Sequence, residues 1–314
     1  LAALIQIAVD GGAGDDSLLG GNGADFLLGG LGNDFLDGNQ GADVVFLGAG
    51  DDVFQWDPGD GSDVVEGQDG FDRMIFNGSA ANERFEVFAN GSRSQFTRDI
   101  ANILIDLDDV EAIDITARGG ADTLTVNDLT GTDLAEVNVD LASLPGGAGV
   151  DAQAVTILVN GTAGNDVVDV FGAGSSVVVV GLHTRVNISN SEGSFDSLVV
   201  STLGGDDGLT ASTLIAGITK LTLDGGDGRD TVLGSHGADV LLGGANADFI
   251  DGQQGNDLVL LGDGDDIFQW EPGDGSDVVE GQAGIDRLDF FGANVNEMID
   301  ISANGSRIRL FRDV

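Results

Sequence analysis

A nine-residue repeat near the start of the chain constrains the fold more than any other feature. From Gly11 the sequence reads GGAGDDSLL, GGNGADFLL, GGLGNDFLD, GNQGADVVF and LGAGDDVFQ, without a gap. Glycine is the most frequent residue at the first, second and fourth places. Aspartate always occupies the sixth place, and an apolar residue always occupies the eighth. A fixed spacing of this kind is typical of one small structural unit stacked many times.

The repeat predicts a tight turn followed by a short strand. Glycine permits the positive φ angles of a turn, and the alternation of side chains along a strand buries the eighth place. Two units would form one flattened coil of about eighteen residues, and coils would stack about 4.8 Å apart. The sixth-place aspartates then form two columns, one of Asp16, Asp34 and Asp52 and one of Asp25 and Asp43.

Aligned carboxylates require a cation between them. Two carboxylates ~5 Å apart repel by roughly 3 kcal/mol at an effective dielectric constant of about 20, so a bare stack should not close. Calcium suits such a site, because it accepts six to eight oxygen ligands, backbone carbonyls included, in flexible geometry. Zinc does not suit it, because the chain has no cysteine and its two histidines, His183 and His236, are far apart in sequence.

This repeat resembles the RTX, or hemolysin-type, calcium-binding repeat, whose pattern is G-G-x-G-x-D-x-U-x with U apolar. The resemblance implies a right-handed parallel β-roll with calcium between turns, held by the aspartates and by carbonyls of the glycine-rich turns. Asn39 and Leu47 depart from the pattern, because they replace a second-place and a first-place glycine. The ligand candidates in this run are Gly11, Gly12, Gly14, Asp16, Gly20, Gly21, Gly23, Asp25, Gly29, Gly30, Gly32, Asp34, Gly38, Gly41, Asp43, Gly48, Gly50 and Asp52. After a two-residue slip at Trp56 and Asp57, two degenerate units add Asp63 and Asp72.

The same module occurs twice in the chain. A shift of 214 positions aligns Leu1–Ile100 with Ile215–Val314 without a gap, and more than half of the aligned residues are identical. Asn246 takes a fourth-place glycine position, which is tolerable because asparagine enters left-handed backbone geometry more readily than most residues. The candidates in the second copy are Gly225, Gly226, Gly228, Asp230, Gly234, Gly237, Asp239, Gly243, Gly244, Asn246, Asp248, Gly252, Gly255, Asp257, Gly262, Gly264, Asp266, Asp277 and Asp286.

We therefore predict an all-β chain in which two calcium-binding rolls are joined by an irregular β-rich, solenoid-like segment. Asn90-Gly91 between two alternating runs predicts a hairpin over 84–98. An independent β-sandwich is the alternative for the middle, where partial turn motifs make Asp122, Asp166 and Asp207 weaker ligand candidates. The expected segments are a first roll at 1–76, the β-rich segment at 77–217, a second roll at 218–290, and the start of a second β-rich segment at 291–314.

Composition narrows the classes of function. A net charge of −42, from 54 acidic and 12 basic residues, argues against nucleic acid and anionic membrane surfaces as partners. The opening LAALIQIAV is too short to span a membrane and predicts a strand leading into the roll. Without cysteine there is no thiol catalysis, and no nucleophile motif or phosphate loop occurs, so we do not expect an enzyme. Trp56 and Trp270 could stack on a sugar, but packing over the end of a core is the favoured interpretation.

The expected function is that of a structural module which folds when it binds calcium. By resemblance, it would belong to a large secreted or cell-surface bacterial protein exported unfolded through a one-step (type I) channel, as an adhesin- or matrix-like spacer. Its partners would be calcium ions and neighbouring repeats of a longer chain, with an extracellular glycan or surface partner as a further candidate. An accessory or carbohydrate-binding module of a secreted calcium-dependent enzyme is the alternative, and a β-helix enzyme domain is a third.

Overall fold

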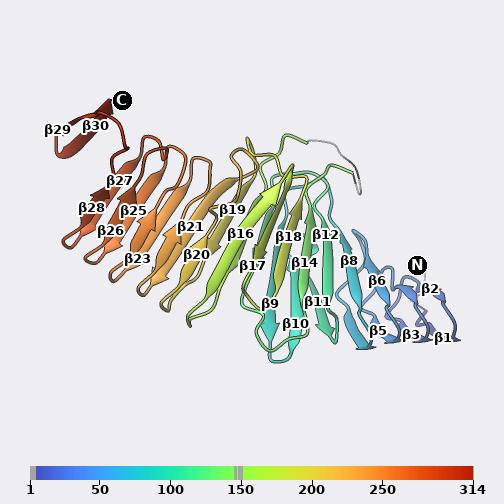
Figure 1. The fold of residues 1–314 in the computed structure, drawn as a ribbon. Coiled ribbons are helices and arrows are strands. Elements are labelled where there is room, and N and C mark those ends of the chain that lie inside the picture. Colours follow the sequence, from blue (N-terminus) through green and yellow to red (C-terminus); the bar gives the residue numbers. More distant parts are fainter. Residues whose placement is uncertain (1–4, 145–146, 148–150, 314) are drawn as a thin grey trace.

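The computed structural model describes residues 5–144, 147 and 151–313. Nearly all regular structure in these residues is β, apart from the single-turn 3₁₀ segment η1 (Ile100–Asn102). Two long sheets of fourteen strands each run side by side through the molecule. Figure 1 shows the coils following one another along an elongated body, with the two ends of the chain at opposite ends. The chain is thus an all-β parallel β-roll that continues as a solenoid, as the repeat predicted.

The two sheets take alternate strands of the chain. In spatial order, sheet A contains β1 (Ala8–Ala13), β3 (Phe26–Leu31), β5 (Val44–Ala49), β7 (Val64–Asp69), β11 (Ile103–Asp108), β10 (Arg93–Arg98), β9 (Arg84–Asn90), β13 (Thr123–Val126), β15 (Thr156–Asn160), β19 (Ser197–Ser201), β21 (Lys220–Asp227), β23 (Val240–Ala245), β25 (Leu258–Asp263) and β27 (Val278–Ala283). Sheet B contains β2 (Ser17–Leu19), β4 (Phe35–Asp37), β6 (Val53–Trp56), β8 (Arg73–Asn77), β12 (Ala112–Thr116), β14 (Glu136–Asp140), β18 (Arg185–Ser189), β17 (Ser176–Val180), β16 (Val167–Ala173), β20 (Gly208–Thr210), β22 (Thr231–Leu233), β24 (Phe249–Asp251), β26 (Ile267–Trp270) and β28 (Arg287–Phe290).

The register of the parallel strands reproduces the sequence spacing. Leu27 pairs with Val45, which is one coil of eighteen residues later. Val45 then pairs with Val65, so that coil contains twenty residues. The two extra residues are the slip at Trp56 and Asp57 that the sequence indicated. Coil length is therefore adjusted at one turn while the buried positions stay aligned.

The core is a column of the eighth-place side chains, enclosed between the two sheets. In the first roll, Leu27, Leu36 and Val45 are fully buried, and Leu18 and Phe54 are nearly so. The second roll repeats this arrangement with Val232, Leu241, Ile250, Val259 and Phe268. The alternation predicted from the repeat is confirmed, because each buried residue faces inward while its strand neighbours lie nearer the surface.

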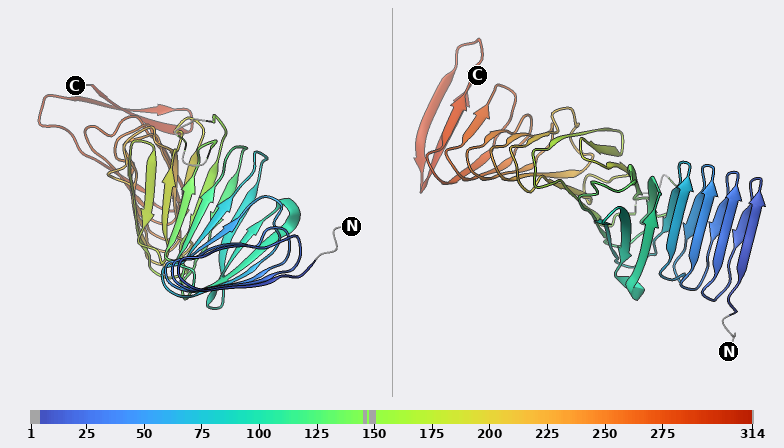
Figure 2. Two further views of the ribbon diagram at one scale, coloured as in Figure 1. Left: turned by 90° about the vertical axis from the view of Figure 1, so that its right-hand side faces the viewer. Right: turned by 90° about the horizontal axis from the view of Figure 1, so that it is seen from below.

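The middle of the chain continues both sheets and does not form an independent sandwich. The expected hairpin is present as β9 and β10, which pair antiparallel with Arg93 opposite Asn90. It is inserted between β11 and β13 of sheet A. A second hairpin, β16–β17, was not anticipated; it lies in sheet B and pairs through β17 with β18. Figure 2 shows how the stack changes direction around these insertions.

A separate two-stranded sheet lies at the C-terminal end. It consists of β29 (Met298–Asn304) and β30 (Arg307–Asp313), joined at Asn304-Gly305, which is the counterpart of Asn90-Gly91 after the shift of 214 residues. Its register equals that of β9–β10 after the shift of 214 residues. Of the predicted leading strand, residues 1–4 lie outside the described residues. No helix long and apolar enough to cross a membrane occurs among the residues described.

Candidate calcium site

The sixth-place aspartates of successive coils form two ladders along the stack, one at each turn of the coil. The first ladder contains Asp16, Asp34, Asp52 and Asp72, and the second contains Asp25, Asp43 and Asp63. In each ladder a carboxylate accepts the backbone N–H of the aspartate one coil earlier: Asp16 N lies 2.8 Å from Asp34 Oδ1, and Asp25 N lies 2.7 Å from Asp43 Oδ1. The second roll repeats the pattern, since Asp230 N and Asp239 N donate to Asp248 and Asp257 at 2.9 Å.

One oxygen of most ladder carboxylates has no protein partner. Thirteen aspartate Oδ2 atoms among the described residues are buried and accept no hydrogen bond. A buried anionic oxygen without a partner is costly, unless a cation lies beside it. The atoms belong to Asp16, Asp34, Asp43, Asp52, Asp63, Asp72, Asp122, Asp207, Asp230, Asp248, Asp257, Asp266 and Asp277.

The first-place glycine leaves a cradle beside this oxygen. A Cβ atom added to Gly225 would lie 2.6 Å from Asp230 Oδ2 and 2.7 Å from the carbonyl oxygen of Gly243, one coil later. A Cβ added to Gly11 would meet the carbonyl oxygen of Gly29 and Asp16 Oδ2 at 2.6 and 2.8 Å. Each cradle is thus lined by a carboxylate and by a carbonyl of the next coil, and any side chain at the glycine would fill it.

Burial makes the unneutralised ladder electrostatically unfavourable. Desolvation, together with the charge of neighbouring carboxylates, raises the pKa of Asp63 and Asp72 to about 7 from an ordinary value of 3.8. In the second roll, desolvation likewise raises the pKa of Asp248 and Asp257 to about 7. These carboxylates resist ionisation in the absence of a cation, because each would place a charge beside another in a dry turn.

The donor set fits calcium. It consists of oxygens only, from carboxylates and from turn carbonyls, which is the set that a hard divalent cation prefers. In the first roll the cation would be held by a ladder aspartate and by the carbonyl of the first-place residue one coil later. When bound, calcium supplies positive charge that turns the repulsion within a ladder into attraction. The chain's own contribution is to hold these oxygens at fixed spacing by the strand register.

Comparison with known proteins agrees with this site. The family model of the RTX calcium-binding nonapeptide repeat, in four copies, matches residues 9–36, 19–54, 222–249, 233–268 and 272–289. A search of curated proteins gave no match. The chain therefore carries RTX calcium-binding repeats in two separate segments, and those repeats bind calcium. The matched segments lie within the two runs of ladders and cradles.

The departures from the repeat pattern are accommodated locally. Asn39 and Asn246 adopt φ angles of 57° and 80°, the left-handed geometry that the glycines of the pattern would supply. Leu47 turns its side chain into the core, where it is fully buried, and its carbonyl oxygen closes the cradle at Gly29. Asp277 and Asp286, which lie in the last coil, accept the amides of Asp257 and Asp266 at 3.0 and 3.3 Å.

The ladders extend beyond the matched repeats. Asp166 N donates to Asp207 Oδ1 at 2.7 Å, and Asp207 N donates to Asp230 Oδ1 at 2.9 Å, so Asp166 and Asp207 join the ladder of the second roll. Asp122 occupies a similar place in the second ladder, where it accepts the N–H of Glu83 at 2.8 Å. Burial raises the pKa of Asp122 to about 7.

Glutamates in ladder positions escaped sequence reasoning. Glu111 Oε2 accepts the N–H of Asp72 at 2.6 Å and so continues the first ladder by one coil. The available signal was the spacing of Glu83 within GSAANE, where glutamate takes the sixth place. A further, mostly exposed group, which consists of Asp108, Asp109 and Asp133, brings carboxylate oxygens within 4.8 Å of one another, and no sequence spacing marked it.

At the β9–β10 hairpin the chain supplies a cation of its own. Arg98 Nε donates to Glu83 Oε1 at 2.5 Å, and both side chains are almost fully buried. Glu83 Oε2 accepts the N–H of Ser79 at 2.7 Å, so this carboxylate has partners on both oxygens. Arg98 also lies over the ring of Trp56, 5.4 Å from its centroid. A guanidinium thus takes the neutralising role where the hairpin interrupts the second ladder.

Trp56 and two arginines near it in the sequence have structural roles. Trp56 is fully buried, stacks on Phe76 and donates from its indole N–H to the carbonyl oxygen of Gly61 at 2.9 Å. Arg73 pairs with Asp114 at 2.6 Å. Arg93 pairs with Glu66, Asp106 and Asp108 at 2.9–3.0 Å. Packing and charge compensation explain these residues.

Proposed function

We propose that this chain is a calcium-triggered structural module, loosely folded without the ion and rigid with it, within a secreted or cell-surface bacterial protein. The observation that carries the proposal is the set of buried Oδ2 atoms without a protein partner, which recurs along both rolls and in several units lies beside a glycine cradle. Stacked carboxylates whose burial already raises the pKa cannot all ionise at neutral pH unless cations lie between them.

The magnitude suffices for a folding switch. Extracellular calcium modules have Kd values of roughly 10⁻⁴ to 10⁻³ M. At a tenfold excess of calcium over Kd, one site that exists only in the folded chain contributes about 1.4 kcal/mol. About ten such sites would contribute roughly 14 kcal/mol, which equals the net stability of a whole domain. Low calcium inside a cell would keep the coils open, and higher calcium outside would close them.

We further propose the division of labour expected from the sequence. Segments 1–76 and 218–290 would be the calcium-dependent rolls, and 77–217 would be a spacer between them that needs fewer ions. The spacer contains the Arg98–Glu83 pair and fewer unpartnered ladder oxygens. An adhesin- or matrix-like role, in which the closed stack extends and presents neighbouring segments, fits a long unbranched solenoid without a catalytic constellation in its sequence.

A calcium titration tests the proposal. Circular dichroism should report a cooperative gain of strand content, and metal analysis of the folded chain should find many ions. Equal strand content in chelator and in calcium would refute it. Asp52→Asn and Asp51→Asn form a matched pair, because both remove one charge from neighbouring residues. Only Asp52 is buried with an unpartnered oxygen. Asp51 is exposed and merely accepts the N–H of Phe71 at 3.0 Å.

The control should leave the fold intact, because an asparagine already makes the equivalent contact in the preceding coil, where Asn33 Oδ1 accepts the N–H of Asp51. Asp52→Asn should require more calcium for folding, while Asp51→Asn should titrate like the unmodified chain. Identical titrations of the two variants would show that the ladder carboxylate is not a ligand.

A further inference from the structure

Three carboxylates gather where the turn after β11 meets the loop between β13 and β14. Asp108 ends β11, Asp109 follows it in the turn, and Asp133 lies in the loop. One oxygen of each carboxylate lies within 4.8 Å of the other two. All three residues lie outside the segments that match the calcium-binding repeat. Like charges at this distance repel, so a cation between them would stabilise the group.

A buried carboxylate oxygen points at the same turn. The side chain of Asp72 is fully buried, and its Oδ2 accepts no hydrogen bond. A Cβ atom added to Gly67 would lie 2.6 Å from this oxygen and would collide with the backbone carbonyl oxygen of Asp109. The two oxygens are therefore neighbours. Because a buried anionic oxygen without a partner is costly, it indicates a cation position beside Asp109, independently of the exposed carboxylates.

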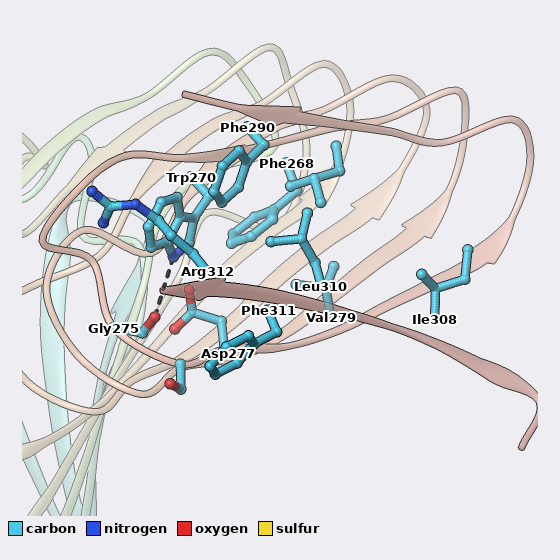
Figure 3. Close-up of a pocket in the computed structure, with 12 residues that line it drawn as sticks. Phe268, Trp270, Gly275, Asp277, Val279, Phe290, Ile308, Leu310, Phe311 and Arg312 are labelled. Atoms are coloured by element: carbon cyan, nitrogen blue, oxygen red, sulfur yellow. Dashed lines mark hydrogen bonds between the residues drawn. The ribbon is translucent and has the colours of Figure 1, made fainter. Parts of the chain in front are cut away.

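The group is not neutralised by the arginine beside it. Among the residues that the structure describes, the one ion pair of the group joins Asp108 to Arg93 at 3.0 Å, and Arg93 is shared with two further carboxylates. Elsewhere a carboxylate has an arginine of its own. At the C-terminal hairpin, Arg312 lies over Trp270 and donates to Glu297 at 2.6 Å (Figure 3). The other two carboxylates of the group have no such partner in the described part of the chain.

The position of the group gives a bound ion a mechanical role. Glu111 is the last carboxylate of the first ladder, and Ala135 takes the next place, one coil later. The N–H groups of Ala135 and Glu136 both donate to the carbonyl oxygen of Glu111, at 2.9 and 3.0 Å. Alanine offers no ligand at the ladder position. An ion between Asp109 and Asp133 would join these two coils where the ladder cannot.

We infer that this group is a further calcium site, outside the nine-residue repeats, which fastens the β13–β14 loop to the turn after β11. Its ligands are the carboxylates of Asp109 and Asp133. Asp108 is shared between the ion and Arg93, and the Asp72 carboxylate lies on the buried side. Calcium fits, because all donors are oxygens and the exposed side admits water to complete a coordination number of about six to eight. The inference rests on the proposed calcium-dependent folding, and its test separates the two.

Hydrogen exchange of the full chain, measured by mass spectrometry at constant ionic strength, tests the site through the loop at 127–135. Rising calcium should slow exchange in this loop, because its amides exchange when the loop leaves the turn. Asp133→Asn removes one ligand at an exposed position. Asp128→Asn is the matched control, since it removes the same charge from the same loop. Asp128 is exposed and accepts the N–H of Thr130 at 2.9 Å, which asparagine can also accept.

The variants should differ in both calcium dependence and ion count. Half-maximal slowing of loop exchange in Asp133→Asn should require at least about tenfold more calcium than in Asp128→Asn, because fewer carboxylates weaken calcium binding. At the calcium concentration that just saturates the control, metal analysis should find one ion fewer. Asp109→Asn should reproduce this loss, and asparagine tolerates the φ angle of 50° at that position. The double variant should lose no second ion, because both residues hold the same one.

Equal loop exchange in Asp133→Asn and Asp128→Asn, or equal ion counts in the two, would overturn the inference. Equal slowing by sodium chloride would also overturn it, because charge screening would then explain the effect. The roll strands, followed in the same digest, report the proposed function separately. If they are protected even in chelator, the proposed function fails, and calcium-dependent slowing confined to the loop would still support the site.

Discussion

Filling one cradle with a single methyl group gives the sharpest test of where the cations lie. In Gly225→Ala the added Cβ would stand 2.6 Å from Asp230 Oδ2 and 2.7 Å from the carbonyl oxygen of Gly243. The φ angle of Gly225 lies outside the left-handed region, so alanine can adopt the backbone conformation. The substitution therefore acts on the space between the two oxygens and not on the backbone.

The magnitude follows from linkage between binding and folding. Once a site is saturated, each bound ion adds about 1.4 kcal/mol to the free energy of unfolding for every tenfold rise in free calcium. Loss of one site should reduce this slope by that amount. At 100 times Kd the variant should be less stable than the parent chain by about 2.7 kcal/mol, in addition to any steric cost.

Urea denaturation followed by circular dichroism at several fixed calcium concentrations measures the slope. Gly208→Ala is the control, because a Cβ there meets nothing within 4 Å and the φ angle is ordinary. It should change the free energy of unfolding by less than about 1 kcal/mol at every calcium concentration. An unchanged calcium slope in Gly225→Ala would show that the cradle does not hold an ion.

Further predictions concern pH, the buried ion pair and the core. In chelator, acidification from about pH 8 to about pH 5.5 should promote coil formation. The reason is that folding raises the pKa of carboxyl groups such as Asp63 from 3.8 to about 7. Such a group stabilises the fold fully below pH 3.8 and loses that contribution as the pH rises through 7. In calcium the same acidification should release ions and destabilise the fold, so parallel pH responses with and without calcium, seen by circular dichroism, would contradict the ladder. Arg98→Met should lower the free energy of unfolding by roughly 3–5 kcal/mol in urea denaturation, because it leaves the Glu83 carboxylate buried and unpaired. The loss should persist at every calcium concentration, and its disappearance at high calcium would mean that an ion replaces the guanidinium. Leu36→Ala should cost roughly 2–5 kcal/mol, whereas Leu31→Ala, at a side chain that is 61% exposed, should stay within about 0.5 kcal/mol, and equal losses would contradict the inward column.

The roll could be predicted well from the sequence, because the nine-residue repeat determines the positions of the turns, the strands and the buried side chains together. Asp34, for example, could be placed in its column from spacing alone, and the twenty-residue coil could be read from the slip at Trp56. The hairpin at Asn90-Gly91 was equally accessible, because its turn residues are local signals.

The middle segment was harder to predict because its signals are not local. The strands of the second hairpin, β16 and β17, are joined through Gly174 and Ser175, and the run of valines that follows suits any strand. Nothing in the sequence therefore says which neighbour each strand takes. The hairpin β9–β10 and η1 lie between Asp72 and Glu111, which are 39 residues apart in sequence. Glu111 nevertheless takes the next place in the first ladder. Its role depends on tertiary register, which no short motif encodes.

The hydrogen bonds of the ladders all have the same direction, and this gives the stack a front and a back. Each carboxylate receives the amide of the coil before it, so a newly added coil completes its predecessor and remains incomplete itself. Growth toward the C-terminus and growth toward the N-terminus are consequently not equivalent events. Glu111 receives the amide of Asp72 and donates its own amide to the carbonyl oxygen of Asp72 at 3.1 Å, so it ends one such series, much as a capping side chain finishes a helix. A shortened or concatenated version of this solenoid would need such a terminator at its trailing end only.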